Sequence, residues 1–508
     1  MNMKKAYSLI SAAGAVLFMS ACNNLDVSNP NQPDVARALS SPGDVQSLAQ
    51  STVRSWYMTS VSAGPDDNGD LTPYHFGSVT SDVTTGNFGN FGMRFNNLEP
   101  RIPYGNSSAG GDRAVTETPW NYNYGTIGAT NDVLRALKNG LSLGSADITE
   151  QYKQEAQFSQ AASFTYLAMQ FDQAFVVTED NDPASPPSLV PYAAVRDSAL
   201  RMWNTLIAAS AGKNYTYALT DLPLKDGALT SGRINRIANT MAAMLLAYSP
   251  RIPAQSASVD WAAVAAYADK GIGTGSAGAP FDIVVVTDRN TWWSYVAAYG
   301  DQQDWIRMDH RVINRMNPAV PPRFGFNASG ASDPTIPPQG TSADARYTTD
   351  FGYRSPPIGD PARGIYMQSV FYHKRYEFTA ESQPGGYTGP VPYMLAAESD
   401  LIHAEALIRS GGNPVTAAQL INNTRVGRGN LPPATGAEGT AALLSMISYE
   451  RDVELVNTSG TTLYWRRAIT DQPMQAGTVC QLPIPAKELE TLALPIYTFG
   501  GVGGNPCS

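Results

Sequence analysis

The sequence is poor in charged residues and in the residues that most often bind metal ions. It has 3 cysteines and 4 histidines among 508 residues, and only 16% of its residues are charged. Acidic residues outnumber basic residues 44 to 35, which gives a net charge of −9, and no dense run of lysine or arginine breaks this balance. Because binding to nucleic acid depends on focused positive potential, we expect no nucleic-acid partner.

Long apolar runs are also missing. A membrane helix needs about 20 apolar residues, and no run of this length occurs. Near the N-terminus, two lysines precede a shorter apolar run from Tyr7 to Met19, and small residues then lead to Cys22. This order is typical of a secretory signal. We expect residues 1–21 to be a signal peptide and a lipidated Cys22 to begin a tether over 22–33. The alternative is a plain signal peptide cleaved nearby, with Cys22 an ordinary thiol.

The few cysteines restrict the covalent chemistry of the mature chain. After lipidation only Cys480 and Cys507 remain, in a compartment that permits disulfides. We expect a disulfide between them that pins the C-terminal tail, and two separate buried thiols are the alternative. No CxxC pair is present, so no zinc site is expected.

Signatures of catalysis are scarce as well. The sequence has no GxSxG, HExxH or P-loop motif. Gly273, Gly275 and Gly278 spell GxGxxG, but they follow a predicted helix and precede a predicted strand over 281–286. A phosphate-binding loop has the reverse order, so this motif indicates a turn. His403 is predicted to lie on a helix surface.

An acidic segment at 66–70 invites a calcium interpretation, because clustered oxygen ligands suit a hard cation. Its spacing fails the EF-hand pattern, since Gly64 stands at the first ligand position and His75 at the last. An Asx-rich turn is the favoured interpretation. We therefore expect no metal and no cofactor, with calcium as the alternative.

Apolar residues recur every three to four positions in several segments, which predicts amphipathic helices. The clearest patterns cover 148–175, 394–408 and 446–456, and weaker ones cover 131–138, 196–209, 236–247 and 261–270. Asp147 and Glu150 can form a capping box for the first helix, and Gly411 and Gly412 end the second. Small residues alternate with aromatic residues on these stripes, which favours close packing in antiparallel pairs.

The patterns divide the mature chain into three parts. Helical periods dominate 34–270, apart from a loop insertion at 64–108, and they return in 393–508 together with the tail. Between them, residues 271–392 are rich in proline and aromatic residues and poor in helical periods. Long ordered loops usually serve function.

Aromatic side chains in these polar loops are the candidate ligand contacts. Flat rings can stack on the apolar faces of sugars while neighbouring polar groups bind hydroxyls. The candidates are Trp292, Trp293, Tyr295, Trp305 and Tyr74. The alternative for each ring is a place in the core of the loop-rich part. Paired carboxylates for glycoside hydrolysis cannot be singled out among 44 acidic residues.

Several blocks, in the same order, resemble the SusD/RagB family of outer-membrane nutrient-binding lipoproteins. The resembling blocks are residues 22–31, 120–131, 155–175, 394–409, 420–425, 449–455, 465–467 and 482–485. They include an AEAL helix at 404–407 and an LIN-x-x-R helix at 420–425. The chain departs from the family between Leu455 and Trp465, where an acidic-Gly-His-Arg stretch is replaced.

The resemblance implies a mainly α fold of tetratricopeptide-like helix pairs that cradle a loop-rich part. It also implies a non-enzymatic lipoprotein on the outer membrane that captures oligosaccharide, or peptide, for a TonB-dependent transporter. A lipid-anchored glycoside hydrolase and a structural transporter cap without a ligand site are the alternatives. The charged members of the blocks are expected in buried or interhelical pairs: Glu405, Arg425, Glu450, Arg451 and Glu454.

Overall fold

The computed structural model describes most of the chain. The expected signal peptide with Cys22, the 66–70 segment, Trp305 and Cys507 lie outside the described residues, so the predictions for them stay predictions. Described are residues 35–61, 73–86, 101–110, 113–182, 185, 187–217, 222–288, 291–301, 306–327, 329, 331–333, 335–355, 369–377, 388–458 and 460–503.

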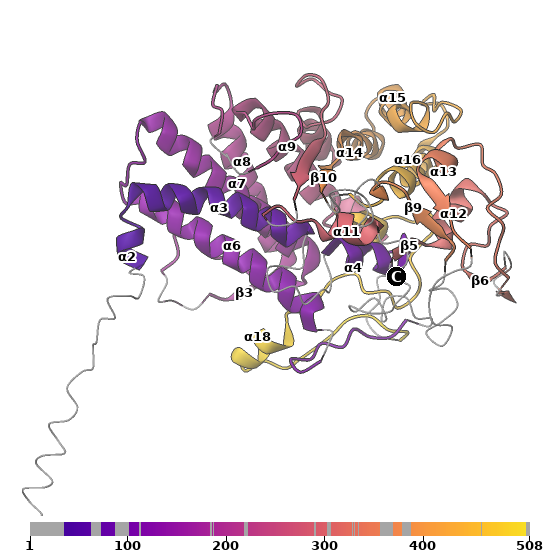
Figure 1. Ribbon diagram of the computed structural model, residues 1–508, viewed down its shortest axis with the longest axis horizontal. Helices are drawn as coiled ribbons and strands as arrows, with labels where there is room; N and C mark the ends of the chain where they lie inside the picture. The colour runs from indigo at the N-terminus through magenta and orange to yellow at the C-terminus, as the bar shows by residue number, and fades with distance from the viewer. Residues whose placement is uncertain are drawn as a thin grey trace, which may run out of the picture.

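Helices make up most of the described regular structure, which confirms the mainly α prediction. The N-terminal helices α2, α3, α6, α7 and α8 gather at the left of Figure 1, α4 lies nearer the middle, and the C-terminal helices α14 to α16 lie at the upper right. The N-terminal helices are α2 (Val35–Ala38), α3 (Pro42–Val61), α4 (Pro73–Thr80), α6 (Ala114–Lys138), α7 (Ala146–Gln170), α8 (Tyr192–Ser210), α9 (Ser231–Ala247), η2 (Pro253–Ser258) and α10 (Trp261–Asp269). The later helices are α11 (Tyr295–Asp301), α12 (His310–Met316), α13 (Arg346–Thr349), α14 (Ala396–Arg409), α15 (Pro414–Arg425), α16 (Thr440–Glu454), α17 (Thr462–Arg466) and α18 (Ala486–Thr491).

Helix α7 is the centre of the N-terminal scaffold. Helices α3, α6, α8 and α9 all pack against it, and nearly every side chain from Tyr152 to Gln170 is buried. The prediction of a single buried stripe is therefore wrong for this helix. Small residues such as Ala161 and Ala162, both 0% exposed, let neighbouring helices approach from several sides.

The ends of α7 also differ from the sequence prediction. Ser145 caps the helix by accepting a hydrogen bond from the Ile148 N–H at 3.3 Å, in place of the expected capping box further along. The helix ends at Gln170, where Phe171 turns to an extended conformation, and Phe175 lies in strand β2. The aromatic repeat thus continues past the helix into the sheet that follows.

The helices pack in succession along the chain. Helix α8 packs on α9, α9 on α10, α10 on α14, and α14 on both α15 and α16. This succession of neighbouring helices confirms the predicted helical scaffold. It also brings the N-terminal and C-terminal scaffolds together, because α10 and α14 lie far apart in sequence but in contact.

Helix α14 ends at the predicted glycines. The Gly411 N–H donates to the Ile408 carbonyl at 3.4 Å, and the Gly412 N–H donates to the Leu407 carbonyl at 2.7 Å. Gly411 has a φ of 74°, a left-handed conformation that glycine adopts without a steric penalty. Met394, expected at the start of this helix, instead ends strand β10.

The strands form short antiparallel pairs around the loop-rich part. The pairs are β1 (Thr84–Gly86) with β5 (Ile306–Met308), β2 (Gln173–Phe175) with β3 (Leu189–Pro191), β4 (Ile283–Thr287) with β10 (Gly389–Met394), β6 (Gly325–Phe326) with β7 (Ser332–Asp333), and β8 (Phe351–Tyr353) with β9 (Phe371–His373). Val285 of β4 lies opposite Val391 of β10. This pair joins the two ends of the 271–392 part, and the predicted glycine turn connects α10 to β4.

The C-terminal tail folds back along an early segment of the chain. The Tyr104 N–H donates to the Phe499 carbonyl at 3.1 Å, and the Asn106 amide donates to two tail carbonyls at 2.9 Å each. Cys480 is disulfide-bonded, and its predicted partner Cys507 lies outside the described residues. The pairing of these two cysteines stays a prediction.

The charged residues of the resembling blocks form buried pairs, as predicted. Arg451 lies 2.6 Å from Glu405, and Arg425 lies 3.7 Å from Glu450. Glu454 is also buried and paired with arginine. These contacts join α14, α15 and α16, so the blocks serve the scaffold.

His403 corrects an expectation, because it is buried rather than exposed on the surface of α14. It is only 7% exposed, since α10 packs over α14. Burial lowers the pKa of its imidazole.

Candidate functional site

Trp292, the first predicted ligand contact in the loop-rich part, belongs to the core. Its side chain is 4% exposed, and its ring centroid lies 5.3 Å from that of Tyr57 on α3. A ring buried in this way has no face for a sugar, so the expectation of an exposed ring at this position is corrected. The pattern of neighbouring residues could not reveal this, because Trp292 and Trp293 stand in the same polar loop.

The loop that carries Trp292 is fixed at several points. Asp288 accepts hydrogen bonds from the N–H groups of Thr291 at 2.5 Å and Trp292 at 2.9 Å. The Asp288 N–H in turn donates to the Trp292 carbonyl at 3.0 Å. Arg54 of α3 donates through Nε to the Thr291 carbonyl at 3.0 Å. Trp292 and these hydrogen bonds fix the loop, and they therefore also fix the backbone position of Trp293.

Trp293 and Tyr295 form a half-buried aromatic pair at the start of α11. Their ring centroids lie 5.6 Å apart, with an interplanar angle of 83°. An edge-to-face pair of this kind is a favoured aromatic arrangement. The structure thus brings together two of the five predicted contacts. Trp305 lies outside the described residues. Tyr74 lies in α4, but the structure does not describe its side chain, so both predictions stay predictions.

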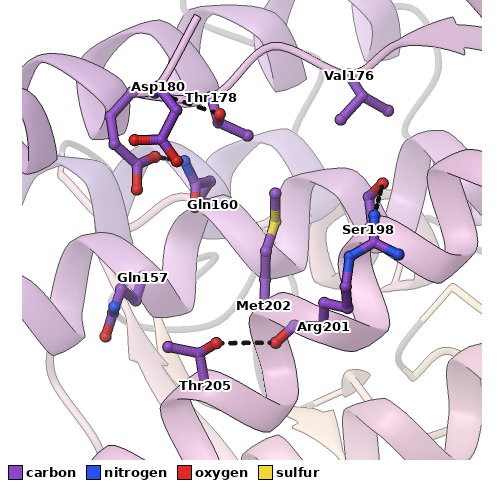
Figure 2. A pocket seen from close by; sticks show the side chains of 10 residues that line it. Gln157, Gln160, Val176, Thr178, Asp180, Ser198, Arg201, Met202 and Thr205 are labelled. Atoms are coloured by element: carbon purple, nitrogen blue, oxygen red, sulfur yellow. Dashed lines mark hydrogen bonds between the residues drawn. The ribbon is translucent and has the colours of Figure 1, made fainter.

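A second candidate is a polar hollow of about 350 Å³ between α7, α8 and the segment that follows β2 (Figure 2). Most of its lining carries hydroxyl, amide or charged groups, and two apolar side chains complete it. The lining residues are Gln157, Gln160, Val176, Thr178, Glu179, Asp180, Ser198, Arg201, Met202 and Thr205.

Hydrogen bonds order the polar side chains of this hollow. Gln160 donates through Nε2 to Glu179 at 3.0 Å, and Arg201 donates through Nη2 to the Ser198 hydroxyl at 2.9 Å. Figure 2 shows the second of these contacts on the α8 side, together with Thr205. The Thr205 hydroxyl donates to the Arg201 carbonyl at 3.0 Å. The side chains are therefore positioned before any ligand arrives.

One acceptor in the hollow is left over. The Oε1 atom of Gln157 is buried and has no hydrogen-bond partner in the part of the chain that the structure describes. A buried polar atom without a partner is costly, so a ligand hydroxyl that donates to this atom would relieve the cost. The hollow can therefore receive a polyhydroxylated molecule.

Sequence reasoning did not find the polar hollow. Its residues come from 157–160, 176–180 and 198–205, and none of these segments carries a binding motif, although 157–160 lies in the resembling block 155–175. Only the packing of α7 against α8 brings them together. Over the described ranges, no group of three or more histidine, cysteine, aspartate or glutamate side chains could hold a metal ion.

Comparison with known proteins supports the fold. No protein-family model matches the sequence, and no curated protein matches it. A SusD superfamily protein from Parabacteroides distasonis is similar in structure, with a TM-score of 0.62, 13% identity, and coverage of 89% of this chain and 98% of that chain. Surface glycan-binding protein A from Bacteroides uniformis gives a TM-score of 0.57 and 14% identity, covering 90% of this chain and 99% of that chain.

A SusD-like carbohydrate-binding protein from Bacteroides fragilis gives a TM-score of 0.56 and 17% identity, covering 85% of this chain and 86% of that chain. The chain therefore has the SusD-like fold over most of its length. The resemblance found in the ordered sequence blocks is confirmed at the level of the fold. None of the helices in the described ranges is long and apolar enough to cross a membrane.

Proposed function

We propose that the protein is a non-enzymatic, cell-surface lipoprotein that binds a glycan and delivers it to a TonB-dependent outer-membrane transporter. The observation that carries this proposal is the SusD-like fold, shared over 89% to 90% of the chain with solved proteins that include a surface glycan-binding protein. The signal-like N-terminus that ends at Cys22 supports the lipid anchor.

The aromatic pair of Trp293 and Tyr295 is the proposed ligand platform. Its rings are only half-buried, whereas Trp292 next to them is fixed in the core. Because Asp288 and Arg54 hold this loop, the pair can stack on a sugar ring without first being ordered. We expect one stacked ring to contribute about 1 kcal/mol to binding.

The polar hollow on α7 and α8 is the second place where the glycan can bind. Its hydroxyl and amide groups suit sugar hydroxyls, and the buried Oε1 of Gln157 needs a donor. No aromatic side chain lines the hollow, whereas the pair of Trp293 and Tyr295 offers aromatic rings. A variant at each place therefore shows which of the two binds the glycan.

Binding measurements on the soluble chain without residues 1–22 test the proposal. A glycan and peptide array first identifies a ligand, and calorimetry then compares Trp293→Ala with Gln157→Ala. A loss of about fivefold in affinity for Trp293→Ala alone places the ligand on the aromatic pair. A matching loss for Gln157→Ala alone places it in the polar hollow.

Other outcomes point to the other classes of protein. Shortened products after incubation with oligosaccharides would identify a glycoside hydrolase. A protein that co-purifies with the transporter but binds nothing on the array would be a structural cap. Binding of peptides rather than glycans would change the ligand class but keep the transport role.

A further inference from the structure

A cationic hollow lies where α8 ends and α9 begins. Its volume is about 580 Å³, and Lys213, Arg233 and Arg236 supply its charged groups. Phe281 and neutral residues from the end of α8, the start of α9 and the turn after α10 complete the lining. This volume falls within the range of about 300 to 1,000 Å³ typical of pockets for small ligands.

The positive charge of this hollow is uncompensated. No carboxylate is among its lining residues, and none of the three cations has an ion-pair partner within the described ranges. Arginines of the C-terminal scaffold differ, because Arg346 and Arg451 each face a carboxylate. In a chain with a net charge of −9, three unpaired cations around one hollow indicate a site for an anion.

Phe281 holds the two arginines side by side. The guanidinium carbons of Arg233 and Arg236 lie 4.8 Å and 4.9 Å from the centroid of its ring. Burial, and then the neighbouring charge of Arg233, lower the pKa of Arg236. An anion between these groups would relieve the repulsion of like charges.

Arg236 contributes charge rather than free hydrogen-bond donors. Its Nε donates to the Gly271 carbonyl at 2.8 Å, its Nη1 to the Ala279 carbonyl at 2.7 Å, and its Nη2 to the Gly273 carbonyl at 3.2 Å. The turn that spells GxGxxG thus directs its carbonyl groups at a cation. A phosphate-binding loop directs N–H groups at an anion, so the polarity of this turn is reversed.

Arg233 and Lys213 keep donors for a ligand. Arg233 uses Nη1 for the Asp226 carbonyl at 3.0 Å, and its Nε and Nη2 have no partner among the described residues. Two adjacent guanidinium N–H groups match the two oxygens of a carboxylate. Lys213 Nζ lies 5.6 Å from the ring centroid of Tyr215 and makes no hydrogen bond to any described residue.

The nearest acidic residues share a second, much smaller hollow with Arg233. Asp226 and Asp282 line this hollow of about 10 Å³ together with Arg233 and Phe281. Asp282 accepts a hydrogen bond from the Ala396 N–H at 2.7 Å. No ion pair joins either acid to Arg233 in the part of the chain that is described.

We infer that the cationic hollow binds the carboxylate of an acidic, uronate-containing oligosaccharide. The anionic character of the ligand rests on the three unpaired cations, and its saccharide character rests on the proposed function. The hollow lies on α8, α9 and the turn after α10, apart from the Trp293 loop in the chain. We therefore expect it to select for charge while the aromatic platform contributes stacking.

Calorimetry with trigalacturonate and with its methyl ester tests this inference on the full mature chain. The two trimers share one sugar framework, and only the first carries carboxylates. We expect the acid to bind at least about tenfold more tightly than the ester at low ionic strength, and we expect salt to reduce this preference. Lys213→Gln combined with Arg233→Gln should abolish the preference, whereas the exposed Lys487→Gln on α18 should retain it.

Equal binding of the acid and the ester would overturn the inference, as would a preference that survives in the double variant. Failure of both trimers to bind would overturn it too. Binding of neutral oligosaccharides that depends on Trp293 would still support the proposed function in that case, so the two failures are distinguishable. A melting temperature of the double variant close to that of the unchanged chain verifies that it folds.

Discussion

Arg311 on α12 holds Asp452 on α16 with both ends of its guanidinium group, through Nη1 to Oδ2 and Nη2 to Oδ1 at 2.7 Å each. Arg315 adds a third contact to Oδ2 at 2.7 Å. The side chain of Asp452 is 0% exposed. Burial alone would raise the pKa of this carboxyl, but the arginines hold the pKa well below its usual value. The pair fixes the loop-rich part, through α12, to the C-terminal scaffold.

Asp452→Ala should therefore destabilise the protein severely. The change leaves the buried Arg311 without its carboxylate and takes one of two carboxylates from Arg315, so we expect the free energy of unfolding to fall by about 3 to 5 kcal/mol. Denaturant unfolding measures this loss. Asp180→Asn is the matched control, because it removes the exposed pair with Lys138 and should change the free energy of unfolding only slightly. A similar small loss for both variants would contradict the assignment of the buried pair.

Glu155 on α7 should make the stability depend on pH. Its carboxyl is 1% exposed, neither oxygen has a partner among the described residues, and burial raises its pKa from 4.5 to about 8. The folded state therefore keeps a proton that the unfolded state loses, and stability falls as the pH rises from 4.5 towards about 8.

Glu155→Gln should remove this loss, so that the variant melts at a higher temperature than the unchanged chain at pH 9 and at a similar temperature at pH 4.5. Thermal melting across this pH range tests the prediction. Glu150→Gln, on the same helix but partly exposed, should leave the pH dependence in place. A steep pH dependence that remains in Glu155→Gln would show that other groups cause it.

Trp292→Ala and Trp293→Ala should affect stability differently although the residues are neighbours. Trp292 packs on Tyr57, so its truncation leaves a cavity that we expect to cost about 3 to 5 kcal/mol. Trp293 is half-buried, so its truncation should lower the free energy of unfolding clearly less. Urea unfolding of the two variants measures the difference. Equal losses would mean that Trp293 is also a core residue and that the ligand platform lies elsewhere.

The disulfide at Cys480 should link this residue to Cys507 and stabilise the tail. A bond that closes this loop should contribute about 3 kcal/mol in the loop-entropy model. Mass spectrometry of unreduced, alkylated protein should find neither thiol free, and reduction should lower the melting temperature. An alkylated Cys507 in the unreduced protein would exclude the pairing.

Cys22 should carry the lipid that anchors the protein. Cys22→Ser should move the protein from the membrane fraction to the soluble fraction, because lipid chains supply the apolar surface for anchoring. Fractionation followed by immunoblotting measures the distribution. Retention of Cys22→Ser in the membrane fraction would contradict attachment through this residue.

Local features of the chain were predictable where short segments decide them. Gly411 at the end of α14 and Gly278 in the GxGxxG turn before β4 have positive φ angles, which few residues other than glycine adopt. The charged residues of the resembling blocks, such as Glu405 and Arg451, were correctly expected in pairs. The order of those blocks was enough to indicate the fold, because each block from 120–131 onward lies in a helix or its flanks.

Burial and the site itself depended on tertiary packing. Helix α7 has a sequence that suits one buried face, yet α3, α6, α8 and α9 surround it. Trp292 and Trp293 look alike in sequence, but only Trp292 meets the ring of Tyr57. Sequence alone therefore could not separate the core tryptophan from the candidate platform.

The two hollows could not be predicted from the sequence either. Gln157 and Thr205 line one hollow only because α7 packs against α8. Lys213 and Phe281 line the other although 68 positions of sequence separate them.

 The cationic hollow is thus assembled from segments that only the packing of α8, α9 and the turn after α10 brings together.

The sequence by itself determined the acidic composition, the main helices with their glycine ends, and the ordered blocks that indicate the fold. These depend on composition and on interactions between residues close in the chain. Only the tertiary structure decided which ring is buried, which carboxyl keeps its proton and where the three cations meet. Solvent exposure and the distance between charges are properties of packed surfaces, and a packed surface joins residues that the sequence keeps apart.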